Sequence, residues 1–151
     1  MHITLKPMII HKFLILLAFV AVNFLGYCDT LDYYHVYLND SLIGKYNSLS
    51  KQPSITLIES ELNDSDVITV RYGTDHPCFE CVYVLTAFAE IKAQIPSATT
   101  NEQFGKLSIP MKDLIYFNKL LGVDSFHFLY SIKTNGQFEN RATHLFTLKI
   151  R

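Results

Sequence analysis

The segment SFHFLYSIK at residues 125–133 decides the fold class, because apolar and polar side chains alternate along it. One face would carry Phe126, Phe128, Tyr130 and Ile132, and the other His127, Leu129, Ser131 and Lys133. Successive side chains of a strand point to opposite faces, so this two-residue period predicts a β-strand with one face in the core. A turn signal, Thr134-Asn135-Gly136, follows it. THLFTLKIR (143–151) then alternates again, with His144 assigned to the same face as Phe146.

Upstream segments extend this β pattern. YHVYLNDSLIGKY (34–46) has apolar segments on both sides of the polar cluster Asn39-Asp40-Ser41, which predicts a hairpin. SITLIE (54–59) and DVITVRYG (66–73) predict two further strands.

The middle of the chain is less clear. CVYVLTAFAEIKAQI (81–95) begins with β-branched apolar residues and ends with good helix formers. We expect one strand to about residue 90 and a second short strand at 91–95, followed by a loop at 96–103. FGKLSIP (104–110) predicts another short strand.

A single helix is expected near residues 112–121, where apolar residues fall on one helical face. Asp113 is early in this segment, Lys119 is late, and Gly122 stands where a C-terminal cap belongs. With seven or eight short strands and one helix, residues 29–151 are predicted to form one all-β domain, an antiparallel β-sandwich.

Residues 1–28 are interpreted as a cleaved signal peptide. Lys6 and Lys12 precede the apolar run FLILLAFVAV (13–22), which is shorter than the roughly 20 apolar residues that a membrane-spanning helix needs. The expected localisation is therefore extracytoplasmic, either periplasmic or secreted.

The end of this segment, LGYC (25–28), leaves two cleavage sites open. Cleavage after Cys28 places Gly26 and Cys28 at the −3 and −1 positions. Cleavage before Cys28 would leave it as a lipid-bearing first residue, since Leu25 and Cys28 resemble a bacterial lipobox. Tyr27 departs from that pattern, which expects a small residue. Membrane attachment is thus expected only if Cys28 is lipidated, as in an outer-membrane lipoprotein.

The number and distribution of charged residues argue against nucleic acid as a partner. The chain has 13 basic and 14 acidic residues, a net charge of −1, and no basic block. A nucleic-acid-binding surface would need a basic stripe, so nucleic acid is not an expected partner.

Cys78 and Cys81, in DHPCFEC (75–81), are expected to form a disulfide across a tight turn. A disulfide needs Cα atoms within about 7 Å, which an extended three-residue segment exceeds. The bridge would fix the shape of a corner between two strands.

The CxxC spacing of Cys78 and Cys81 is also compatible with a redox site. VITVRYGTDHPCFECVYVLTAFAEIKA (67–93) superficially resembles the thioredoxin layout of strand, CxxC motif and helix. That resemblance implies an exported thiol–disulfide oxidoreductase using Cys78 and Cys81, and it requires a helix beginning at Cys81. The residues after Cys81 are instead β-branched, and Glu80 would raise the thiol pKa.

No metal or cofactor is expected. A zinc site needs four ligands, whereas one cysteine pair and scattered histidines are present. Phosphate-loop, GxSxG and HExxH motifs are missing, so the sequence favours a protein that is not an enzyme.

The leading hypothesis is an exported binding or accessory module at the cell envelope, with an unidentified protein or glycan as partner. Loops on a rigid scaffold commonly carry binding residues. The corner comprising Asp75, His76, Phe79 and Glu80 is the expected binding loop.

Overall fold

The computed structural model describes residues 31–74, 78, 80–89, 94–139 and 142–151. The predicted signal peptide with Cys28 lies outside the described residues, as do Asp75, His76 and Phe79 of the predicted binding loop. All that follows concerns the unit Leu31–Arg151.

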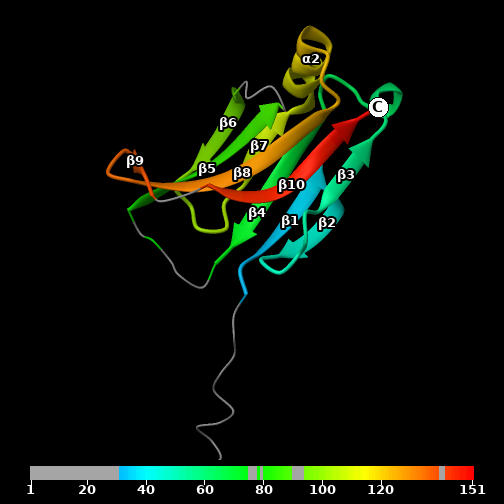
Figure 1. The fold of residues 1–151 in the computed structure, drawn as a ribbon. Helices are drawn as coiled ribbons and strands as arrows, with labels where there is room; N and C mark the ends of the chain where they lie inside the picture. Colours follow the sequence, from blue (N-terminus) through cyan, green and yellow to red (C-terminus); the bar gives the residue numbers. More distant parts are fainter. Residues whose placement is uncertain (1–30, 75–77, 79, 90–93, 140–141) are drawn as a thin grey trace, which may run out of the picture. The chain divides into compact units, whose positions relative to one another are not determined.

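This unit is mostly β, with two sheets and one α-helix in its described part (Figure 1). The four-stranded sheet has the order β2 (Ser41–Asn47), β1 (Tyr33–Leu38), β4 (Val67–Gly73) and β7 (Leu107–Pro110). The six-stranded sheet has the order β3 (Ser54–Leu57), β10 (Thr143–Ile150), β8 (Ser125–Thr134), β5 (Cys81–Ala89) and β6 (Gln94–Thr100), and its sixth strand, β9 (Gln137–Phe138), pairs with β8.

Both sheets contribute to one apolar core. Tyr34 of β1 stacks against Phe146 of β10, with ring centroids 6.5 Å apart. Phe126 and Phe128 of β8 are completely buried in the same cluster. The inward-facing rows of both sheets thus supply the apolar burial that stabilises the unit.

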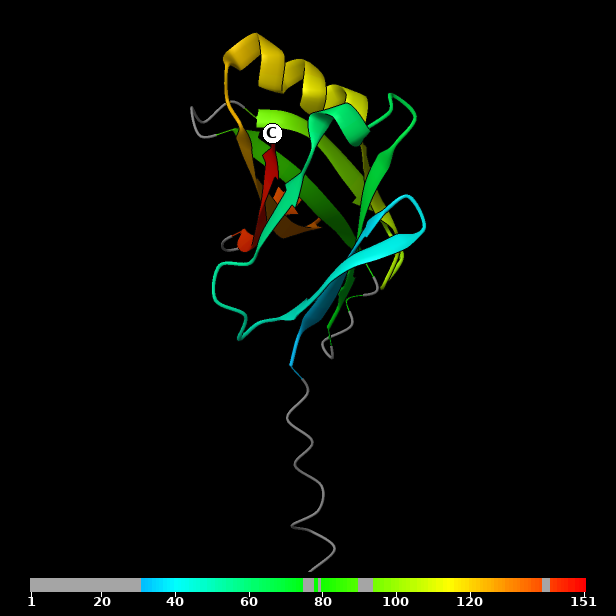
Figure 2. The same cartoon turned by 90° about the vertical axis from the view of Figure 1, so that its right-hand side faces the viewer.

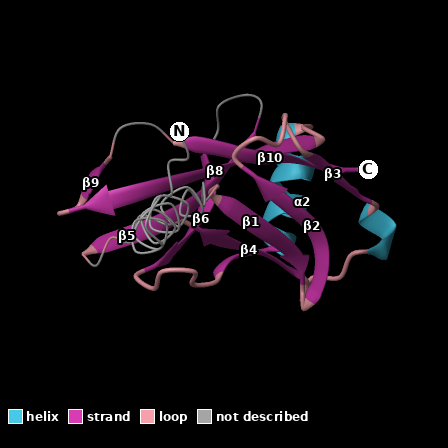
Figure 3. Cartoon of the chain, turned by 90° about the horizontal axis from the view of Figure 1, so that it is seen from below, coloured by secondary structure: helices cyan, strands magenta, loops and turns pink. Residues whose placement is uncertain are grey.

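The helix α2 (Met111–Leu121) packs near β6 and β7 and buries Met111 and Leu114. It crosses one end of the sheets in Figure 2 and lies behind the strands in Figure 3. Gly122 ends it with a left-handed backbone, φ 64°, so the predicted helix and its glycine cap are confirmed. Within the described residues, no helix is long and apolar enough to cross a membrane.

The predicted hairpin is confirmed as β1 and β2, and the strands at 66–73 and 125–133 are confirmed as β4 and β8. The described part has ten strands, more than the seven or eight expected. β9 was missed because it is only two residues long, too short for any period to be visible.

The sheets are not wholly antiparallel, contrary to the sequence prediction. β3 pairs in parallel with β10, placing Ile55 beside Leu148. Side-chain periodicity identifies a strand but carries no information on the direction of its partner, which explains the error.

The second strand of the 81–95 segment was also placed wrongly. β6 spans residues 94–100 and so occupies much of the predicted loop at 96–103. It is an edge strand, where a proline such as Pro96 is tolerated because one side of the strand needs no ladder hydrogen bond. Residues 90–93 lie outside the described residues.

A register irregularity changes the predicted faces of β10. The pairing with β8 shifts between His144 and Phe146, so that Leu145 is buried and His144 is exposed. The prediction that His144 shares a face with Phe146 is therefore wrong, because a bulge breaks strict alternation.

Candidate functional site

Strand pairing gathers polar residues at the end of the sheets opposite α2. Tyr33 is the register partner of Gly73, which places Asp32, just before β1, near Thr74, just after β4. In the other sheet, Ile132 of β8 pairs with Tyr83 of β5. The helix follows the opposite end, where Pro110 pairs with Val67.

A cavity of about 190 Å³ lies at this end, and we call it the acidic cavity. It is lined by Asp32, Tyr72, Thr74, Tyr130, Ser131, Ile132, Glu139 and Thr143. Two carboxylates and five hydroxyls are among these groups, and none of the described lining residues is a lysine or arginine. Its volume is below the roughly 300–1,000 Å³ of pockets that hold drug-sized ligands. The acidic cavity would therefore hold a single functional group of a ligand.

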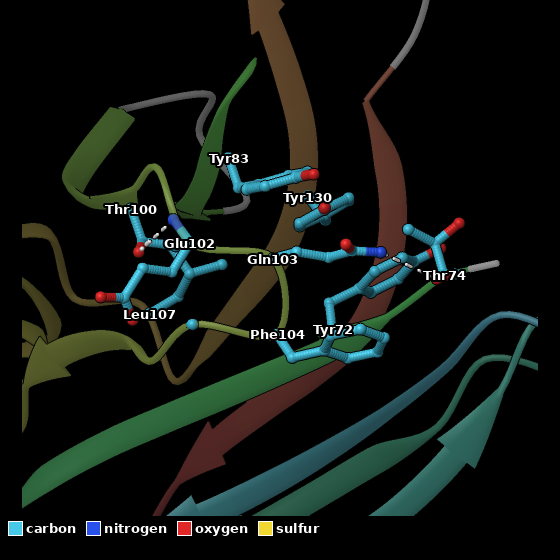
Figure 4. A pocket seen from close by; sticks show the side chains of 10 residues that line it. Tyr72, Thr74, Tyr83, Thr100, Glu102, Gln103, Phe104, Leu107 and Tyr130 are labelled. Carbon is cyan, nitrogen blue, oxygen red and sulfur yellow. Dashed lines mark hydrogen bonds between the residues drawn. The ribbon is translucent and has the colours of Figure 1, made fainter. Parts of the chain in front are cut away.

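Stacked tyrosines form the inner wall of the cavity. The Tyr72 and Tyr130 rings lie 4.0 Å apart and nearly parallel, and Tyr83 stacks 6.1 Å from Tyr130 on the other side. Figure 4 shows these three rings around a smaller adjoining hollow, into which Gln103 also reaches. The Gln103 side-chain amide donates to the Thr74 carbonyl at 3.4 Å.

Two of these tyrosines hold their protons strongly. The Tyr72 hydroxyl donates to Asp32 Oδ2 at 2.8 Å. Burial raises the pKa of Tyr72, and the hydrogen bond to Asp32 raises it further. Burial likewise raises the pKa of Tyr130, with additional contributions from Tyr83, Tyr72 and Asp32. Both phenols are therefore neutral at physiological pH.

The Tyr130 hydroxyl opens into the acidic cavity. The residue is only 5% exposed, and its hydroxyl has no hydrogen-bond partner among the described residues. Every fully buried side-chain nitrogen or oxygen atom in this part of the chain has a partner. The Tyr130 oxygen is therefore not sealed in the core, and its residue lines both the acidic cavity and the smaller adjoining hollow.

The Cys78–Cys81 corner adjoins the cavity wall. These cysteines stand at disulfide distance, with Cα atoms 5.5 Å apart, as predicted. The Tyr83 hydroxyl donates to the Cys78 carbonyl at 3.2 Å. Cys81 Sγ lies 3.2 Å from Thr134 Oγ1, and the Thr134 hydroxyl donates to Glu139 Oε1. Contacts therefore run from the corner to both the tyrosine stack and a cavity carboxylate.

The redox alternative required a helix at Cys81, whereas β5 begins there. Of the predicted binding loop, Glu80 is an exposed turn residue, and the other three residues lie outside the described part. The candidate site thus neighbours the predicted loop but is built from other residues.

Sequence reasoning missed Asp32, Tyr72, Tyr130 and Glu139 as site residues. Tyr130 was assigned correctly to an inward face, but nothing in the local sequence indicated an open hydroxyl. The two carboxylates come from opposite ends of the domain sequence, and only the strand order brings both to one cavity.

A second polar cluster lies on the six-stranded sheet. The His127 and His144 rings are 5.6 Å apart, and Thr147 Oγ1 lies 3.1 Å from His127 Nδ1. In the part of the chain that the structure describes, no three His, Cys, Asp or Glu side chains are grouped so as to hold a metal ion.

Comparison of the chain with protein-family models, curated proteins and solved structures finds no match.

Proposed function

We propose that this protein is an exported, non-catalytic binding module: a β-sandwich, preceded by a signal peptide, that captures an amine-bearing group in the acidic cavity. The group would belong to a small molecule or to the end of a larger partner at the cell envelope. The open hydroxyl of the otherwise buried Tyr130, beside two carboxylates, is the observation that carries this proposal.

The donor and acceptor inventory favours an ammonium group. Asp32 and Glu139 each accept one hydroxyl through one oxygen, and their second oxygens accept no hydrogen bond within the described part of the chain. With the Tyr130 oxygen, the cavity offers three acceptors. A protonated primary amine has three donors and no acceptor, so its needs match this set.

The fixed carboxylates support binding as the role of the cavity. Asp32 is held by Tyr72, and Glu139 is held by Thr134, which itself contacts Cys81. Such preorganisation reduces the ordering that a ligand must impose when it binds. The negative charge that remains attracts a cation.

An NMR titration tests the ligand class with n-butylamine, its neutral counterpart n-butanol, and tetramethylammonium, which has charge but no N–H donor. We expect n-butylamine to shift resonances around Tyr130 and to bind at least tenfold more tightly than either other probe. Equal binding of n-butanol would overturn the proposal.

Two pairs of variants test whether n-butylamine binds in the acidic cavity. Tyr130→Phe and Glu139→Gln each remove one cavity group and should weaken n-butylamine binding about tenfold. Tyr116→Phe and Glu61→Gln make the same chemical changes at exposed positions on α2 and at Glu59–Glu61, outside the cavity lining. Binding that falls equally in all four variants would place the amine elsewhere.

Export is tested by an intact mass measured on protein from its native fraction. A mass beginning at Asp29 supports a soluble module. A mass beginning at an acylated Cys28 supports the alternative, an outer-membrane lipoprotein subunit carrying the same cavity. A mass that retains residues 1–28 would contradict both forms of export.

A further inference from the structure

The outer face of the four-stranded sheet combines cationic and aromatic side chains that are dispersed in the sequence. β1 contributes His35, which pairs with Lys45 of β2 on one side and with Arg71 of β4 on the other. Lys106, just before β7, lines the same hollow as Arg71. These residues form a row across the strands, and we call it the cationic row.

Aromatic rings flank this row on both sides. Along β1, Tyr33 precedes His35 and Tyr37 follows it on the same face. The Arg71 guanidinium lies 5.8 Å from the centre of the Tyr37 ring. At the other side, Tyr33 and Phe104 are 45% and 47% exposed, with ring centroids 6.4 Å apart and planes 30° apart.

Two backbone features hold the Tyr33–Phe104 pair on the sheet. Phe104 has a left-handed backbone, φ 62°, which is unfavourable for a residue with a side chain. Both rings lie over Gly73: a Cβ atom added there would stand 2.5 Å from Tyr33 Cζ and 2.8 Å from Phe104 Cε1. The bare glycine backbone thus allows two solvent-exposed rings to lie side by side against the sheet.

From this arrangement we infer that the outer face of the four-stranded sheet binds an acidic polysaccharide, through carboxylates on the cationic row and sugar rings on Tyr33 and Phe104. Three permanent cations on one face of a chain with net charge −1 are complementary to a polyanion. The apolar C–H faces of sugar rings fit exposed aromatic rings.

The hollow beside Arg71 favours a sugar acid over a nucleic acid. It has a volume of about 160 Å³ and is lined by Tyr37, Asn39, Asp40, Thr69, Arg71 and Lys106. Asp40 adds an acceptor to this hollow, and neither the phosphodiester nor the deoxyribose within a DNA strand carries a hydroxyl that could donate to it. A sugar acid has hydroxyl donors for Asp40 as well as a carboxylate for Arg71 and Lys106.

Isothermal titration with oligogalacturonate tests this inference, with neutral maltooligosaccharide and single-stranded DNA as comparison ligands. We expect oligogalacturonate to bind at least tenfold more tightly than either, and its affinity to fall with added salt. Equal affinity for the neutral sugar would overturn the role of the cationic row. Tighter binding of DNA would overturn the choice of polysaccharide.

Paired substitutions distinguish binding at this face of the sheet from a general effect of the protein's positive charges. Arg71→Gln with Lys106→Gln should weaken oligogalacturonate binding at least tenfold. The control pair Lys112→Gln and Lys149→Gln removes the same charge from α2 and β10 and should leave the affinity within twofold. A control pair that loses as much affinity as the test pair would contradict a defined site.

The aromatic pair has its own test. Phe104→Gly removes one ring and relieves the left-handed backbone, so it should fold normally while binding oligogalacturonate about tenfold more weakly. If a folded Phe104→Gly protein binds oligogalacturonate as tightly as the unmodified protein, sugar rings do not stack on Phe104. Tyr130→Phe should bind oligogalacturonate like the unmodified protein, so this inference and the proposed amine site can fail separately.

Discussion

The ring of Tyr72 in the four-stranded sheet stacks on the ring of Tyr130 in the six-stranded sheet, with centroids 4.0 Å apart. Near the acidic cavity the two sheets therefore touch through phenol rings, whose hydroxyls have different surroundings. The Tyr72 hydroxyl is bonded to Asp32, whereas that of Tyr130 opens into the cavity. The same pair of side chains thus joins the sheets and presents a polar atom to a ligand.

This difference predicts how Tyr130 contributes to stability. Tyr130→Phe keeps the ring and removes a hydroxyl that has no hydrogen-bond partner among the described residues, so the free energy of unfolding should change by less than about 0.5 kcal/mol. Tyr130→Ala also removes the ring and should cost about 3–5 kcal/mol. Urea unfolding measures both values. Equal losses in the two variants would mean that the hydroxyl is structural.

Removing the Cys78–Cys81 bridge should have a modest effect on stability. Cross-linking residues only three positions apart restricts the unfolded chain little, so Cys78→Ser with Cys81→Ser should cost about 2 kcal/mol. Binding of n-butylamine should also weaken, because Cys81 contacts Thr134, which holds Glu139. Thermal unfolding and the NMR titration measure the two effects. A protein that no longer folds would show that the corner contributes far more than its loop length predicts.

Gly122 should resist substitution for a reason of backbone conformation alone. Its φ of 64° is unfavourable for residues with a side chain, yet a Cβ atom there would meet nothing within 4 Å. Gly122→Ala should therefore destabilise the protein by about 1 kcal/mol, which lowers Tm by about 4 °C. Gly122→Asn should cost less, because asparagine tolerates this conformation better. Calorimetry compares the two variants, and equal losses would argue against a conformational cause.

His144 should make the protein less stable in mild acid. Although the His144 side chain is largely exposed, its partial burial lowers its pKa below the usual 6.5, and the neighbouring His127 lowers it further. The unfolded chain then binds a proton more readily than the folded one. The contribution of neutral His144 to the free energy of unfolding is complete above about pH 6.5. It is lost as the pH falls through the lower pKa that His144 has in the folded state. His144→Gln should reduce the difference in unfolding free energy between pH 7.5 and 5.5, and His35→Gln serves as the control. An undiminished difference in His144→Gln would contradict this assignment.

Local patterns predicted the elements that depend on local chemistry. The hairpin around Asn39 and the helix ending at Gly122 rest on turn and cap residues that are visible in sequence. The parallel pairing of β3 and the irregularity beside His144 depend on partners distant in sequence, so periodicity could not reveal them.

The candidate sites were less predictable for the same reason. The absence of a basic block in the sequence argued against a stripe that binds nucleic acid, yet cross-strand pairing aligns Lys45 and Arg71 with His35. Asp32 and Glu139 likewise share a cavity only after the strand order is set. The approach of Cys78 and Cys81 to disulfide distance was predicted correctly, because residues three positions apart need only a tight turn between them to come this close.

The position of β10 between β3 and β8 has a consequence for biosynthesis. β3 is made early, but its pairing partner consists of residues 143–150 and emerges from the ribosome much later. The edge of β3 therefore stays unpaired during most of translation, and the six-stranded sheet cannot be completed before β10 is available.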